Sequence, residues 1–354
     1  MRHFLSVAAV LICACSGAAG PEGPAGPAGS AGAQGPSGPA GASPEAGAPN
    51  VTSLVSSLDL PESAPYPNSI SSTADGTLFV GGLLGQVVKF DTTSTHGSLV
   101  IPQVGPQGTV LANLMVDPAT STLYACGDLF AGTAENPFAN PAATLYAFDL
   151  DGKPKASYPL PNQGSSLCED IAIGAGGTVY VTDPFLGAVD VLAGSTVTTW
   201  KTDALLQANF SNPVPPFGVH GVAVAGTNVF VGNFSTSSLF RIPVKGDGSA
   251  DAMVQETASI TNPERLVALD ATHLLVAEDV WCGSGAVAEL TQSGADAWTT
   301  TVLKNGIMGA TSVTVANGSY WAVESQVCAI ITQLAGGPAA NPVLPFWIDR
   351  IDAD

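Results

Sequence analysis

The chain has 354 residues, of which 45% are apolar and only 11% are charged. Its 29 acidic residues outnumber its 10 basic residues, and the formal net charge at pH 7 is −19. An acidic surface repels phosphate backbones, so we predict that nucleic acid is not a partner. The charge suits a divalent cation or a cationic ligand, and it is equally consistent with solubility alone.

The N-terminal segment has the pattern of a secretory signal. Basic residues at positions 2 and 3 precede an apolar run over residues 4–12, which is too short to span a membrane as a mature helix. The sequence from Ile12 to Cys15 resembles a bacterial lipobox, so we predict a signal over residues 1–15 and a lipid anchor on Cys15. The anchor would be the only membrane contact of a protein at the bacterial cell envelope. A cleaved signal that leaves Cys15 unmodified, and a secreted product, is the alternative.

A collagen-like run follows the signal. Glycine occupies every third position from Gly20 to Gly41, and proline fills many positions between them. The triple helix of collagen requires this spacing, because only glycine fits at its axis. We predict that residues 16–50 form an extended, disordered tether without a core, and trimerisation of the run is the alternative.

Short runs rich in β-branched residues recur from residue 51 onward. Residues 167–191 show the pattern clearly, with apolar runs at 171–173, 179–181 and 189–191 that are separated by Gly, Pro and Asp. Such runs predict an antiparallel meander. Six meanders in succession predict an all-β fold, a six-bladed β-propeller of four-stranded antiparallel blades over residues 51–354. We expect the propeller to be monomeric.

Three strands of each blade can be placed from the sequence. They cover residues 68–71, 77–81 and 86–91; 114–117, 122–125 and 144–149; 171–173, 179–181 and 189–191; 221–224, 228–232 and 238–242; 265–269, 273–277 and 285–290; and 311–315, 320–323 and 329–334. Residues 130–142 form an insertion, predicted to be a surface loop over one face. The outer strand of blade six is expected from either residues 51–58 or residues 344–351, which would close the ring.

One position recurs at the start of each innermost strand. It holds Asn68, Asn113, Glu169, His220, Glu264 and Thr311, with gaps of 45, 56, 51, 44 and 47 residues. Equivalent positions in a propeller surround the mouth of its central channel. We therefore expect these six side chains to lie close together and to line a channel that takes a small-molecule ligand or substrate.

Glu169, His220 and Glu264 come from consecutive blades. Two carboxylates and an imidazole can hold a divalent cation, and we predict one such ion, with Asn68 as a further ligand. The same groups could supply a general base and acid. A water-filled channel without function is the alternative interpretation.

A second set of polar residues follows the second strands. It comprises Asp128, Asp183, Asn233, Glu278 and Glu324. These residues are typical of turns that cap the next hairpin. In the other interpretation some of them line the ligand pocket. We predict that Asp183 and Asn233 do so, together with Asn113 and Thr311 of the recurrent position.

Four cysteines lie in the predicted propeller, at positions 126, 168, 282 and 328. The signal directs them to an oxidising compartment, and four cysteines permit three connectivities. Pairing between neighbouring blades favours Cys126–Cys168 and Cys282–Cys328. Buried free thiols are the alternative, and the spacings do not match a zinc site.

Three stretches carry a family resemblance: Ser166–Ala172, Val219–Ala223 and Asn262–Val267. They resemble the gluconolactonase and senescence-marker-protein family of six-bladed propellers, and the resemblance spans roughly residues 51–354. It implies one divalent cation, calcium or zinc, in the channel. The ligand positions of the family, which hold Glu, Asn, Asn and Asp, fall here on Asn68, Glu169, His220 and Glu264. All four differ in identity from the family residues, although each can bind a metal.

The resemblance also implies lactone hydrolysis, in which the metal polarises the lactone carbonyl and an acidic residue is the base for water. Glu264 is the expected base here, and Glu169 is the second candidate. No serine-hydrolase elbow, phosphate loop or zinc-protease motif is present in the sequence. A non-catalytic binding propeller displayed on the stalk is the main alternative, and a structural surface protein with a trimeric stalk is the third.

Overall fold

The computed structural model describes residues 56–352, except for 63–64, 93, 133–138, 210–216, 281–282 and 335–341. The chain divides into two units, Met1–Gly47 and Ala48–Asp354, and every described residue belongs to the second. The predicted signal, the lipid anchor on Cys15 and the tether lie outside the described residues. Within the described ranges, no helix combines the length and the apolar character needed to span a membrane.

The second unit is a six-bladed β-propeller of four-stranded antiparallel sheets, which confirms the predicted fold. The first three blades contain β2 (Pro67–Ser72), β3 (Leu78–Gly82), β4 (Val87–Phe90) and β5 (Ser98–Ile101); β6 (Val110–Asp117), β7 (Thr122–Phe130), β8 (Pro141–Asp149) and β9 (Pro154–Pro159); and β10 (Ile171–Ile173), β11 (Val179–Asp183), β12 (Ala188–Ala193) and β13 (Thr196–Thr202).

The next two blades contain β14 (Val219–Ala225), β15 (Asn228–Asn233), β16 (Ser238–Pro243) and β17 (Val254–Glu256); and β18 (Pro263–Ala268), β19 (His273–Glu278), β20 (Ser284–Gly294) and β21 (Ala297–Met308). The sixth blade combines β22 (Val313–Ala316), β23 (Ser319–Val323), β24 (Trp347–Asp352) and β1 (Ser57–Asp59). Turn residues end the strands as expected, since Gly76 adopts a φ of 91° in the turn between β2 and β3.

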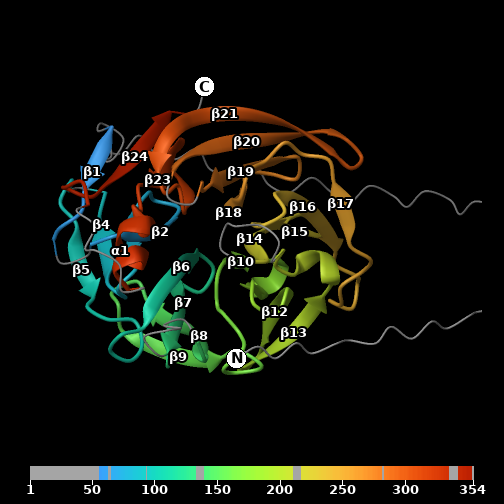
Figure 1. Cartoon of the computed structure of the whole chain (residues 1–354), viewed down its shortest axis with the longest axis horizontal. Coiled ribbons are helices and arrows are strands. Elements are labelled where there is room, and N and C mark those ends of the chain that lie inside the picture. The colour runs from blue at the N-terminus through green and yellow to red at the C-terminus, as the bar shows by residue number, and fades with distance from the viewer. Residues whose placement is uncertain are drawn as a thin grey trace, which may run out of the picture. The chain divides into compact units, whose positions relative to one another are not determined.

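The innermost strands form a closed ring. β2 contacts β6, β6 contacts β10, β10 contacts β14, β14 contacts β18, β18 contacts β22, and β22 returns to β2. In Figure 1, β2, β6, β10, β14 and β18 lie nearest the centre, whereas β5, β9, β13, β17 and β21 lie at the periphery. The first residues of the innermost strands are therefore neighbours in space.

The sixth blade closes the ring with strands from both ends of the described chain. Both candidate segments take part, because β24 pairs with β23 and β1 pairs with β24. The predicted third strand over residues 329–334 is wrong, because Val327–Leu334 forms the helix α1. A short continuous apolar run fits a buried strand and a helix equally well, so its periodicity cannot separate them. Residues 133–138 of the predicted insertion lie outside the described residues.

The core consists of six apolar clusters, one at each junction between neighbouring blades. Phe79 of β3 packs with Leu111 of β6, for example, and Phe230 of β15 packs with Leu274 of β19. The junction between blades six and one contains Trp321 and Ile348 with Ile70 and Val80. Every blade is therefore buried on both faces, which makes the ring rigid around its centre.

A disulfide joins Cys126 of β7 to Cys168, which precedes β10, and so connects blades two and three. This is the pairing between neighbouring blades that the sequence favoured. Cys328 is disulfide-bonded as well. Its predicted partner, Cys282, lies outside the described residues, so that pairing stays a prediction.

Candidate functional site

The innermost strands carry β-bulges at the recurrent position. The pairing of β18 with β19 shifts between Pro263 and Arg265, which leaves Glu264 outside the regular ladder. The same shift occurs between Val219 and Val222, around His220, and between Pro67 and Ser69, around Asn68. A bulge leaves a residue unpaired and redirects its side chain. The bulges thus explain why the side chains at this position are oriented differently from those in the rest of each strand.

Glu169 reaches the equivalent position just before β10. Its backbone N–H donates to the carbonyl of Thr182, and the N–H of Thr182 donates to the carbonyl of Asp170, both at 3.0 Å. Two consecutive residues therefore face one residue of the neighbouring strand, as in a bulge. The predicted register is correct for Glu169, His220 and Glu264.

The three side chains converge on one point. His220 Nδ1 lies 3.5 Å from Glu169 Oε1 and 3.3 Å from Glu264 Oε2. One donor atom from each residue can be chosen so that all lie within 4.8 Å of one another. Two donor atoms that share an ion at about 2.1 Å are separated by about 3 Å, so this spacing fits a common cation. The side chains of Glu169 and Glu264 are 11% and 13% exposed, so the cluster is not fully closed from solvent.

His220 is buried without a hydrogen bond. It is 3% exposed, and neither ring nitrogen has a hydrogen-bond partner among the described residues. A buried polar group without a partner is costly, and binding an ion would remove that cost. Burial lowers the pKa of His220 to about 3, so the imidazole is neutral, which is the form that binds metals.

Burial disfavours the ionised form of both carboxyl groups, which raises their pKa values. Burial, followed by the charge of Asp170, raises the pKa of Glu169 to about 8. Burial raises the pKa of Glu264 well above its usual value, and the nearby charges of Glu169 and Asp279 add to this effect. A divalent cation between them would stabilise the ionised forms and reverse these shifts.

Asp279 is a third acidic residue beside the Glu169–His220–Glu264 cluster, and the sequence pattern missed it. It directly follows β19, it is 2% exposed, and its Oδ1 has no hydrogen-bond partner in the described part of the chain. Its backbone N–H donates to the carbonyl of Asn262 at 3.2 Å, which holds it beside the Glu264 bulge. Burial raises the pKa of Asp279 to about 6. The repeat pattern selected Glu278 instead, whose Oε1 accepts from the N–H of Thr261.

The residues that directly follow Glu169 and Glu264 in the sequence, Asp170 and Arg265, form a buried ion pair. Arg265 Nη1 contacts Asp170 Oδ1, and Asp170 also accepts from the N–H of Val222 at 2.8 Å. Arg265 Nη2 donates to the carbonyl of Leu114 at 3.4 Å. These contacts connect blades two, three, four and five at the centre of the ring. The repeat pattern of the sequence does not indicate this pair.

Asn68 and Thr311, at two of the other recurrent positions, form hydrogen bonds between neighbouring blades. Asn68 Nδ2 donates to the carbonyl of Ala112 at 2.7 Å, and its Oδ1 accepts from Ser325 Oγ at 3.3 Å. Thr311 Oγ1 donates to the carbonyl of Asn68 at 2.9 Å. Asn113 Oδ1 accepts from the next N–H, that of Leu114. The predicted role of Asn68 as a ligand, and of Asn113 and Thr311 in lining a pocket, stays a prediction.

Asp183 and Asn233 cap loops. Asp183 Oδ1 accepts from the N–H groups of Leu167, Phe185 and Leu186, each at 3.1 Å. Asn233 Nδ2 donates to the carbonyls of Leu205 and Gln207 at 2.9 Å, and its Oδ1 accepts from the N–H of Thr236. These contacts fit the turn-capping interpretation. The other interpretation, in which Asp183 and Asn233 line a pocket, stays a prediction.

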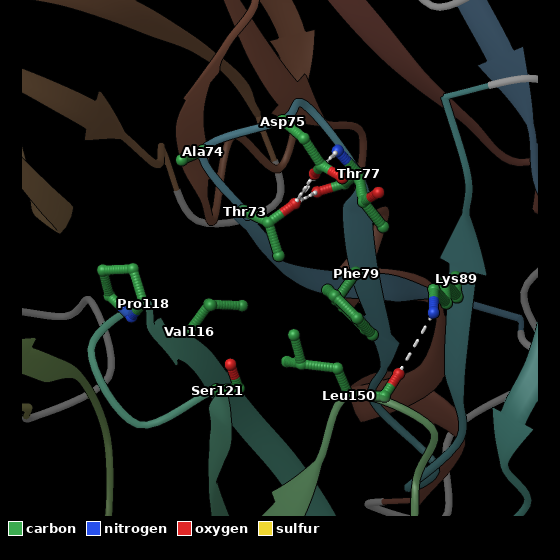
Figure 2. A pocket seen from close by; sticks show the side chains of 10 residues that line it. All are labelled: Thr73, Ala74, Asp75, Thr77, Phe79, Lys89, Val116, Pro118, Ser121 and Leu150. Atoms are coloured by element: carbon green, nitrogen blue, oxygen red, sulfur yellow. Dashed lines mark hydrogen bonds between the residues drawn. The ribbon is translucent and has the colours of Figure 1, made fainter.

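A surface pocket lies between blades one and two, at the opposite ends of β2 and β6 from Asn68 and Asn113 (Figure 2). Its lining includes Phe79, Val116 and Lys89. Lys89 Nζ donates to the carbonyl of Leu150 at 3.3 Å and lies 3.6 Å from Asp151. The pocket contains none of the predicted site residues, so it is distinct from the Glu169–His220–Glu264 cluster.

Comparison with solved structures confirms the propeller fold. The allergen Mala s 1 of Malassezia sympodialis has a TM-score of 0.62 at 14% identity, and the match covers 84% of this chain and 96% of the allergen. A gluconolactonase from Xanthomonas campestris has a TM-score of 0.54 at 13% identity, covering 83% of this chain and 89% of that enzyme. The PQQ-bound aldose sugar dehydrogenase of Streptomyces coelicolor has a TM-score of 0.51 at 14% identity, covering 84% and 98%.

These similarities establish the fold and no more, since the three proteins differ in what they do. No model of a known protein family matches the sequence. No curated protein matches it either.

Proposed function

We propose that Glu169, His220 and Glu264 bind one divalent cation, calcium or zinc, and that the protein is a cation-dependent lactone hydrolase. The observation that carries the proposal is His220, a buried imidazole that lies 3.5 Å and 3.3 Å from two carboxylates and has no hydrogen bond among the described residues. Neighbouring carboxylates are common at protein surfaces and do not by themselves indicate a cation site. The buried imidazole of His220, which lies between the carboxylates without a hydrogen bond among the described residues, is the additional feature that does.

The choice of lactones rests on the resemblance in sequence pattern and on the shared fold with the gluconolactonase of Xanthomonas campestris. A bound divalent cation polarises a carbonyl oxygen and stabilises the negative charge that develops there. In the hydrolysis, a water oxygen attacks the carbonyl carbon while a carboxylate accepts the water proton. The ring C–O bond then breaks, and the same proton passes to the departing alkoxide, which gives a hydroxy acid.

Glu264 is the proposed base and Glu169 the second candidate. Both side chains retain some exposure, at 13% and 11%, so water can reach them. Asp279, with an unpartnered Oδ1, lies beside Glu264 and can hold a proton when Glu264 serves as a ligand.

The test is the metal content of the purified full chain, with thermal melting before and after chelation. About one equivalent of calcium, zinc or manganese and a melting temperature that falls on chelation would support the site. In His220→Ala the affinity for the cation should fall by at least about tenfold, because a ligand is lost. His273→Ala is the matched control, since His273 is a partly exposed residue at the start of β19 that contacts Asp270. Unchanged cation titration in His220→Ala would remove His220 from the site.

A non-catalytic binding propeller is the rival function, and one observation favours it. The resemblance places a ligand position on Asn68, whose amide is instead engaged with Ala112 and Ser325. Cation binding without hydrolysis of any lactone in a screen would select this rival.

We also propose that the propeller is displayed at the bacterial cell envelope through a lipid on Cys15. The lipobox-like sequence supports this location. Mass spectrometry of the N-terminal peptide tests it, since a lipidated Cys15 supports the anchor and an unmodified residue favours secretion.

A further inference from the structure

An aromatic wall adjoins His220. The ring of Phe217 lies 5.1 Å from that of His220 at an angle of 69°, and the ring of Phe234 lies 5.0 Å from it. Phe185 stacks with Phe217 at 6.2 Å and 10°. We call Phe185, Phe217 and Phe234 the aromatic wall.

The wall stands at the same end of the blades as the cluster. Phe217 precedes β14, Phe234 follows β15, and Phe185 lies in the turn between β11 and β12. Backbone hydrogen bonds connect these loops, because the N–H of Gly218 donates to the carbonyl of Pro184 at 3.2 Å and the N–H of Phe234 donates to the carbonyl of Gly218 at 2.9 Å. The loops that carry the three rings are thus joined to one another through the backbone.

The wall extends from the interior to solvent. Phe234 is 1% exposed, whereas Phe185 is 39% exposed. A large apolar side chain that is partly exposed and stacked beside a buried polar site presents a surface for an apolar ligand group. A ring bearing several hydroxyl groups would lose hydrogen bonds with water against these phenyl rings.

We propose that the aromatic wall is a substrate subsite for an apolar ring or chain. The substrate class is then a lactone with an aromatic or aliphatic substituent, and not a polyhydroxylated sugar lactone. This inference rests on the proposed cation site and lactone chemistry, and it adds the part of the substrate that lies beside the reacting carbonyl.

Two lactams that differ in polarity provide the binding test. 3,4-Dihydro-2-quinolinone carries a fused benzene ring, whereas gluconolactam carries hydroxyl groups, and neither is an ester. Isothermal titration of the full chain, saturated with its cation, should give at least about tenfold tighter binding of the quinolinone. Phe185→Ala should weaken quinolinone binding by about 3- to 10-fold, the value of one lost aromatic contact, and leave gluconolactam unchanged.

The control variant is Val302→Ala, which removes an exposed apolar side chain of the outermost strand β21. It should change neither affinity. Equal binding of the two lactams, no binding of the quinolinone, or unchanged quinolinone binding in Phe185→Ala would each overturn the subsite.

The outcome separates this inference from the proposed hydrolysis. Phe185-dependent lactam binding without hydrolysis of dihydrocoumarin or gluconolactone would support the subsite and contradict the hydrolase. Hydrolysis of both lactones at equal kcat/KM, with no effect of Phe185→Ala, would support the hydrolase and overturn the subsite.

Discussion

Arg265 and Asp170 form an ion pair at the centre of the propeller in which their side chains are only 1% and 0% exposed. Each residue directly follows one of the carboxylates of the candidate cation site, Glu264 or Glu169. The pair connects blades three and five beside that site, and its stability therefore affects how the site is held.

Replacing Asp170 with asparagine should destabilise the protein strongly. The substitution leaves the Arg265 guanidinium buried without its counter-ion, which costs about 3–5 kcal/mol. Urea denaturation measures this change in the free energy of unfolding. Lys245→Ala, which breaks an exposed pair with Asp251, should change it by less than about 1 kcal/mol. A comparable, small effect of both variants would contradict the structural importance of the central pair.

The inner strands of blades four and five approach closely at Gly221. A Cβ at this position would lie 2.9 Å from the backbone nitrogen of Leu266, and backbone atoms cannot move aside cheaply. We expect Gly221→Ala to lower the melting temperature and to weaken cation binding, because it separates His220 from Glu264. Gly246→Ala is the matched control, since nothing lies within 4 Å of its added Cβ. Equal melting of the two variants would contradict this reading of the ring.

The sequence predicted the fold and the three converging side chains because both depend on a local repeat. A bulge marks the start of β14 and of β18, and an equivalent backbone arrangement precedes β10, so spacing alone aligns Glu169, His220 and Glu264. The roles of Asp279 and Arg265 could not be predicted in this way. Their positions depend on which side chains meet across the ring, and no repeat encodes that contact.

The helix α1 is a part of the fold that the local sequence pattern could not predict. Its residues, Val327–Leu334, are mostly apolar and partly β-branched, which fits a strand as well as a helix. Residues 329–334 cannot pair with β23 as a third strand, because β24 occupies that place. That pairing involves a segment more than a dozen residues further along the chain.

Asp190 provides a test of pH dependence away from the cation site. Burial raises the pKa of this carboxyl, on β12, to about 6, an effect that Thr199 partly offsets. An unfolded aspartate has a pKa near 3.9, so the folded state holds the proton more tightly. The associated stability is fully present below about pH 4 and is lost as the pH rises to about 6.

Asp190→Asn should therefore match the wild type near pH 4 and exceed its stability above pH 6, by about 1–3 kcal/mol. Denaturation curves at several pH values measure the difference. Asp251→Asn, at an exposed carboxylate, should show no such rise. A difference from the wild type that stays constant between pH 4 and 7 would contradict the buried, proton-binding state of Asp190.

Glu264→Gln should have opposite effects with and without the cation. In chelated protein the variant should melt above the wild type, because burial disfavours the ionised form of Glu264 and the neighbouring acidic groups add to this cost. With cation at 100 times its Kd, the wild type should gain about 2.7 kcal/mol and the variant much less, which reverses the order. The control is Glu289→Gln, on β20, since Glu289 contacts Tyr320 and lies outside the cluster. This variant should gain as much stability from the cation as the wild type does. A variant that gains as much stability from the cation as the wild type would show that the ion binds elsewhere, whereas the reversal requires Glu264 to be its ligand.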